Sequence, residues 1–166
     1  MKVLGIDPGL RITGYGVVAV PERWAGDSAS MKILEAGIVN AKSREGIAER
    51  LRKIYQALSE VIEEFKPDVL VIEKLYAHYA HPATAILMGH ARGVVCLLSG
   101  MYDVPLVSIA STHVKKAVTG KGHAKKSQVQ NMIQHEFSLA RLPEPPDVAD
   151  ALAVALAYLA TVKKKR

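Results

Sequence analysis

The chain has 166 residues, of which 49% are hydrophobic and 23% are charged, so it can bury a full core and is not a disordered protein. Its single cysteine, Cys96, excludes an internal disulfide and suits a reducing compartment. The N-terminus lacks the pattern of a signal peptide, and we expect no apolar run long enough to cross a bilayer. These features predict a soluble cytoplasmic protein that does not associate with a membrane.

The net charge is +6, and the positive charge is concentrated in the second half of the chain. Between Glu73 and Glu136 the only acidic residue is Asp103, whereas the same stretch holds seven lysines and arginines and all six histidines. Such a long cationic segment favours a polyanionic partner, above all nucleic acid. The alternative is a basic surface that serves only solubility.

The first half of the chain predicts three strands followed by a helix. Segments rich in β-branched residues and punctuated by glycine predict strands over 2–8, 12–20 and 31–41. Apolar residues then recur every three or four positions from Ile47 to Phe65, which predicts an amphipathic helix with Ser43 as its N-cap. Pro67 ends this helix, since proline cannot continue it.

The second half predicts alternating strands and helices. In chain order we expect a buried strand over 69–73, a helix over 82–101, a strand over 105–109, short helices around 120–122 and a helix over 146–162. The prediction is therefore an α/β fold: a mixed five-stranded sheet with three antiparallel strands, then strand–helix alternation, flanked by helices. Residues 1–162 form one domain in this prediction, and the basic tail 163–166 is expected to be disordered.

Acidic residues are predicted at the strand ends, where open sheets of this kind bind their ligands. Asp7 and Glu73 end two of the predicted strands, while Asp147 and Asp150 share one face of the first turn of the last helix. Together these oxygens would hold Mg²⁺ or Mn²⁺, and two such ions would support phosphodiester hydrolysis. Taken singly, each acid has an ordinary alternative: a turn residue, a polar strand end, or an acid favoured by the helix dipole.

Five stretches of the sequence carry a family resemblance. They are GIDPGLRITGYGVV, IEKLY, MGHARGV, THVKKAVTGKGHAKKSQVQNMI and PDVADALAVAL. In this order they cover nearly the whole chain, and the chain resembles the RuvC family of bacterial Holliday-junction resolvases, within the ribonuclease-H-like superfamily. GIDPG alone would be weak evidence, because actin-like kinases and related nucleases use similar glycine-flanked aspartates.

The resemblance implies a homodimeric, Mg²⁺-dependent endonuclease that resolves four-way DNA junctions by paired symmetric cuts in recombination and repair. A branch-migration motor complex is left open as a further partner. The matching motifs assign catalysis and metal binding to four acids: Asp7, Glu73, Asp147 and Asp150. Lys126 joins them as a catalytic basic residue. The residues expected to contact DNA are Tyr76, which would stack on a base at the junction centre, and Lys74, Arg92, Lys115, Lys116, Lys121 and Lys125.

The sequence departs from the family pattern just after Glu73. Lys74 replaces the usual glutamine, and the next segment lacks the usual asparagine and carries His78 and His81. These changes leave the contacts at the junction core open, while a zinc site is not expected because the Cys/His spacing is missing. For Lys74 we weigh a phosphate contact against an ordinary strand neighbour, and for Tyr76 base stacking against a core tyrosine.

The helix over 82–101 is expected to form the dimer contact implied by the resemblance. It carries more apolar side chains than one face against the sheet needs: Ile86, Leu87, Met88, Val94, Val95, Leu97 and Leu98. The alternative is a helix buried in a monomer core. For function, the alternatives are a related nuclease acting on ribosomal RNA precursors or RNA–DNA hybrids and a non-catalytic junction-binding module. An actin-like ATPase would need two such domains.

Overall fold

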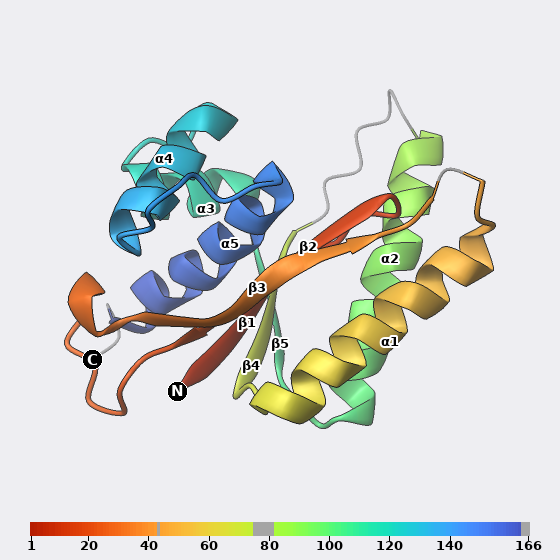
Figure 1. Ribbon diagram of the computed structural model, residues 1–166, viewed down its shortest axis with the longest axis horizontal. Coiled ribbons are helices and arrows are strands. Elements are labelled where there is room, and N and C mark those ends of the chain that lie inside the picture. Colours follow the sequence, from red (N-terminus) through yellow and green to blue (C-terminus); the bar gives the residue numbers. More distant parts are fainter. Residues whose placement is uncertain (43, 75–81, 164–166) are drawn as a thin grey trace.

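A five-stranded mixed sheet forms the centre of the molecule (Figure 1). The computed structural model describes residues 1–42, 44–74 and 82–163. The strands are β1 (Lys2–Asp7), β2 (Ile12–Ala19), β3 (Lys32–Asn40), β4 (Val69–Glu73) and β5 (Leu106–Ile109). They lie in the order β3-β2-β1-β4-β5, where β3, β2 and β1 are antiparallel neighbours and β1, β4 and β5 run parallel. This confirms the predicted sheet.

Helices cover both faces of the sheet (Figure 1). On one face lie α1 (Ile47–Phe65) and α2 (Pro82–Met101); on the other lies α5 (Pro146–Lys163), with α3 (Ser111–Thr119) and α4 (Lys126–Glu136) packed against it. A short 3₁₀ helix, η1 (Ser28–Ser30), precedes β3. All predicted strands and the long helices are confirmed, with bounds that differ by one residue at most. The helix α5 reaches Lys163, and the rest of the predicted tail, 164–166, lies outside the described residues.

Alternation along the strands divides the core into two layers. Leu4 and Ile6 of β1 pack with α1 and α2, whereas Val3, one position away, packs on the α5 side. In β4, Leu70 and Ile72 likewise face α1 and α2, and Val69 and Val71 face α5. Since side chains alternate between the two faces of a strand, the next positions, Asp7 and Glu73, fall on the α5 side.

Glycines in β1 and β2 let α5 lie directly against the sheet. A Cβ at Gly5 would collide with the backbone carbonyl of Ala151, and one at Gly14 with that of Asp147. The facing helix contributes small buried residues, including Ala155. Because these two positions lack a side chain, the first turn of α5 lies against Gly14, which is paired with Asp7 at the end of β1.

The beginning of α1 differs from the prediction. Its N-cap is Gly46 and makes no side-chain capping bond, so the expected N-cap at Ser43, which lies outside the described residues, is wrong. Glu45 organises this turn instead: its carboxylate accepts a hydrogen bond from the Lys42 amide at 3.1 Å and pairs with Lys53 at 2.6 Å. Lys66 ends the helix in a left-handed conformation, directly before the predicted stop at Pro67.

The helix α2 leaves much of its apolar surface uncovered. Ala91, Val95 and Leu98 are buried in the chain's own core. The large exposed side chains on this helix are Ile86, Leu87, Met88, Leu97 and Met101. By length and composition alone, the window Thr84–Met101 could cross a membrane, because small and aliphatic residues outweigh the polar ones in it. The expectation that no apolar segment is long enough was therefore wrong. Only 17% of this window is buried.

Candidate active site

Asp7 is held at the end of a buried strand by a tightly bonded turn. It pairs with Gly14 of β2 as the last residue of β1. In the turn that follows, the fully buried Thr13 donates its hydroxyl hydrogen to the Gly9 carbonyl at 2.7 Å and accepts a hydrogen bond from the Gly9 amide at 3.3 Å. The two bonds between Thr13 and Gly9 thus hold the turn that directly follows Asp7.

Asp147 and Asp150 come to the same place from the other layer. Asp147 lies in the first turn of α5 and Asp150 three positions further along, so their side chains share one face of the helix. The close approach of this helix to Gly14 sets Asp147 beside the β1–β2 turn. As predicted, the structure brings the ends of β1 and β4 close to the start of α5.

The pKa of Asp7 reflects both its burial and the nearby acids. Burial, together with the charges of Asp150, Glu73 and Asp147, raises its pKa from 3.8 to about 7, against the opposing effect of Lys126. Burial also raises the pKa of Glu73, together with the charge of Asp150. The site therefore holds more negative charge than its surroundings stabilise.

Glu73 is anchored at both its carboxylate and its backbone. Its carboxylate accepts a hydrogen bond from the Ser111 hydroxyl, which opposes the rise in its pKa. Its carbonyl accepts a hydrogen bond from the Arg92 guanidinium at 2.9 Å, and a second nitrogen of the same guanidinium donates to Ser108 at 2.7 Å. Sequence reasoning missed Ser111; only its position after β5, in the first turn of a predicted short helix, hinted at it.

Two of the predicted lysines lie next to the acids. Lys126, the first residue of α4, forms an ion pair with Asp150 at 3.0 Å, and this hydrogen bond raises the pKa of the lysine. Lys115, on α3, is close enough to lower the pKa of Glu73. Both positive charges thus face the carboxylates from the outer helices.

The other predicted lysines are exposed at the surface. Lys74, Lys121 and Lys125 are exposed, around the end of β4 and between α3 and α4. Lys116 is exposed and lines a separate cavity between α3 and the end of α5. Tyr76, His78 and His81 lie outside the described residues, so their predicted roles stay predictions.

The donor set fits a divalent cation of the Mg²⁺ class. Four carboxylates offer hard oxygen ligands, and their mutual repulsion, seen in the raised pKa of Asp7, is what a bound cation would offset. Within the described residues, no three acidic, histidine or cysteine side chains already form a metal-binding cluster. Asp150 is engaged with Lys126 instead, so metal binding would require the carboxylates to close up.

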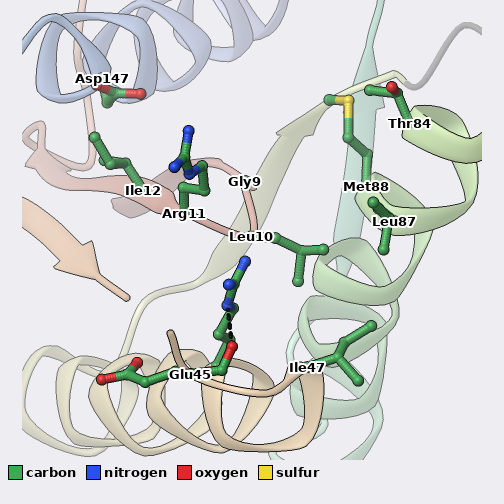
Figure 2. Close-up of a pocket in the computed structure, with 11 residues that line it drawn as sticks. Gly9, Leu10, Arg11, Ile12, Glu45, Ile47, Thr84, Leu87, Met88 and Asp147 are labelled. Carbon is green, nitrogen blue, oxygen red and sulfur yellow. Dashed lines mark hydrogen bonds between the residues drawn. The ribbon is translucent and has the colours of Figure 1, made fainter. Parts of the chain in front are cut away.

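A separate apolar cavity of about 660 Å³ adjoins the acids on the other side of the β1–β2 turn. Figure 2 shows Asp147 and Ile12 at one end of it and the start of α2 at the other. Its apolar walls come from Leu10, Ile12, Ile47, Leu87 and Met88. Such walls do not suit a phosphate, so the acidic cluster on the α5 side is the candidate reaction centre.

Comparison with known proteins agrees with this geometry. Residues 3–158 match the family described as crossover junction endodeoxyribonuclease RuvC. The chain belongs to the RuvC family. A RuvC of Rhodopirellula baltica is 44% identical over 160 residues, covering 95% of this chain and 86% of its own, and one of Alkaliphilus oremlandii is 40% identical over 161 residues, covering 97% and 94%.

Solved structures extend the similarity to three dimensions. A Thermus thermophilus RuvC in complex with a Holliday junction substrate superposes with a TM-score of 0.89 at 32% identity, covering 99% of this chain and 96% of its own. The yeast mitochondrial Holliday junction resolvase Ydc2 has a TM-score of 0.63 at 16% identity, covering 98% of this chain and 80% of its own, and shares the fold alone. The ribonuclease-H-like fold expected for the RuvC family is thus confirmed.

Proposed function

We propose that this chain is a metal-dependent endonuclease that resolves four-way DNA junctions by paired symmetric cuts, in homologous recombination and DNA repair. The observation that carries the proposal is the gathering of Asp7, Glu73, Asp147 and Asp150 at one edge of the sheet, in a chain of the RuvC family. The proposed substrate is DNA, and the proposed location of the protein is the cytoplasm.

The four carboxylates are the proposed metal ligands, with two ions per site. Bound Mg²⁺, or Mn²⁺ in its place, supplies a nucleophilic water at neutral pH and neutralises charge on the leaving oxygen. The chain itself holds the acids in place: Asp7 through the β1–β2 turn and Glu73 through Ser111. With metal ions bound, the negative charge of the four carboxylates would be largely offset when a substrate phosphate enters the site.

Lys126 and Lys115 stabilise the scissile phosphate in this proposal. Both lie on the outer helices beside the acids, and a positive charge fixed next to developing negative charge lowers the barrier for its formation. Metal binding by Asp150 would leave the Lys126 ammonium available for this role, because Asp150 is its partner in the ion pair. The exposed Lys74, Lys116, Lys121 and Lys125 would hold the DNA arms through general attraction to phosphates.

A homodimer completes the proposed activity. One chain offers one set of four carboxylates, whereas resolution needs two symmetric cuts, which a two-fold dimer supplies. The exposed apolar side chains of α2, among them Ile86 and Leu97, offer the contact surface. Arg92 on the same helix is hydrogen-bonded to the sheet, so α2 is attached to the chain's own fold and is not proposed to cross a membrane.

The decisive experiment compares substrates. Purified protein with Mg²⁺ should cut a synthetic four-way junction into two nicked duplexes, and should leave plain duplex and RNA–DNA hybrid largely intact. Preferential cutting of the hybrid would replace this proposal by the related ribonuclease activity. Binding of the junction without any cutting in Mg²⁺ or Mn²⁺ would replace it by a binding module. Sedimentation at micromolar protein should show the mass of two chains.

A further inference from the structure

The end of strand β4 is attached to α2 through one guanidinium. Arg92 Nη1 donates to the backbone carbonyl of Glu73 at 2.9 Å, and Nη2 donates to the hydroxyl of Ser108 at 2.7 Å. Ser108 lies on β5, the neighbouring strand. A single side chain thus joins a helix to two strands at the point where the sheet presents an acid.

The backbone around Glu73 is bonded on its other side as well. Glu73 pairs in register with Ile109, and the Lys74 amide donates to the Ile109 carbonyl at 2.7 Å. β4 ends at Glu73, and the Arg92 guanidinium donates a hydrogen bond to the carbonyl of this last residue. The Ser111 hydroxyl then holds the carboxylate.

We propose that Arg92 is a positioning residue that fixes the end of β4, and with it Glu73, for metal binding, and that it is not a DNA ligand. The inference rests on the proposed function, since it assigns a residue to the same site. Arg92 is only partly exposed, and two of its three nitrogens are committed to protein oxygens. The planar fork of an arginine can reach two acceptors at once, which a lysine ammonium on a flexible stem does less well.

The test separates positioning from phosphate binding by its readouts. Arg92→Lys keeps the charge and loses the fork, and Arg92→Ala removes both. Ser108→Ala removes one acceptor, and Arg52→Lys on the exposed surface of α1 is the matched control. Each full-length variant is measured for Mn²⁺ binding without DNA by electron paramagnetic resonance. Junction affinity is measured in Ca²⁺ at several salt concentrations, and single-turnover cleavage is measured across Mg²⁺ concentrations.

We expect Arg92→Lys to bind Mn²⁺ at least about five-fold more weakly and to cut about ten-fold more slowly, with part of the rate recovered at high Mg²⁺. Its junction affinity and salt slope should stay within about two-fold of the wild type. Ser108→Ala should change Mn²⁺ binding and cleavage in the same direction by about three-fold. Arg52→Lys should change neither quantity.

The opposite pattern would overturn the inference. If Arg92→Ala bound Mn²⁺ like the wild type but lost junction affinity, with a salt slope smaller by about one, Arg92 would be a phosphate ligand. Should the Arg92 variants fail to fold, an unchanged Ser108→Ala would overturn it equally. A wild-type chain that cuts no four-way junction would refute the proposed function, while the Mn²⁺ comparison would still decide the role of Arg92.

Discussion

The acids and the lysines of the candidate site are supported in different ways. Asp7 and Glu73 continue strands whose preceding residues, such as Ile6 and Ile72, are completely buried. Lys126 extends from the outer helix α4, with 78% of its side chain exposed. The difference indicates a division of labour, in which the core fixes the atoms that must not move and the surface supplies charge that can adjust.

The ion pair between the two groups fits this division. Lys126 and Asp150 meet at 3.0 Å at the surface, and exposed pairs contribute only about 0–1 kcal/mol to stability. Exchange of this partner for a substrate phosphate or a cation would therefore cost the fold little. Changes on the core side should be severe and all-or-none, whereas changes on the surface side should be graded.

The largest effect is expected from Asp7→Asn. The substitution keeps the shape of the side chain and removes a ligand charge, so single-turnover cleavage of a four-way junction in Mg²⁺ should fall by at least about 1,000-fold. Junction affinity in Ca²⁺ should be unchanged or higher, because less negative charge faces the DNA. A variant that cleaves at the wild-type rate would show that Asp7 is not part of the reaction centre.

A smaller but still large effect is expected from Gly14→Ala. The added methyl group would collide with the backbone carbonyl of Asp147, and backbone can yield only by moving α5 away from the sheet. We expect the free energy of unfolding to fall by at least about 2 kcal/mol and cleavage to be lost with it.

The matched control for this change is Gly100→Ala on α2. A Cβ there meets nothing within 4 Å, so stability should stay the same or rise by about 0.5–1 kcal/mol. Thermal and denaturant unfolding of both variants measures the contrast. Equal stability of the two would mean that the close approach of α5 does not constrain the site.

The third prediction concerns stability and pH in the absence of metal. Burial and the neighbouring acids raise the pKa of Asp7 from 3.8 to about 7 in the folded state, so folding favours its protonated form. The free energy of unfolding should therefore fall as pH rises from about 4 to about 7. In EDTA, Asp7→Asn should be more stable than the wild type at pH 8, by about 2–4 kcal/mol, and the gap should narrow towards pH 5.

Denaturant unfolding at the two pH values measures this gap. Asp103→Asn, at an exposed acid in a left-handed backbone position that asparagine tolerates, is the control and should show no such gap. A gap for Asp7→Asn that is the same at both pH values would mean that the ionised carboxylate carries no penalty in the folded protein.

The sequence predicts the fold better than it predicts the support of the site. Strand ends and helix starts are local patterns, and they were enough to place all four acids at one edge. The close approach of α5 was not predicted, because the contacts of Gly5 and Gly14 with the carbonyls of Ala151 and Asp147 depend on how α5 packs on the sheet. The bonds of Arg92 were not readable, because they join segments whose relative orientation only packing decides.

The smallest effects should separate Lys126 from Lys116. Lys126 lies against the acids, so Lys126→Ala should slow single-turnover cleavage by about 10- to 100-fold with little change in junction affinity. Lys116 lines a different cavity, beside His113 and the end of α5, and can act only on more distant phosphates. Lys116→Ala should therefore leave the rate at saturating protein unchanged and reduce the salt slope of binding by about one. If Lys126→Ala and Lys116→Ala lost junction affinity equally, Lys126 would be one of the general DNA contacts. The distinction between a charge at the reaction centre and a charge along the DNA path would then be lost.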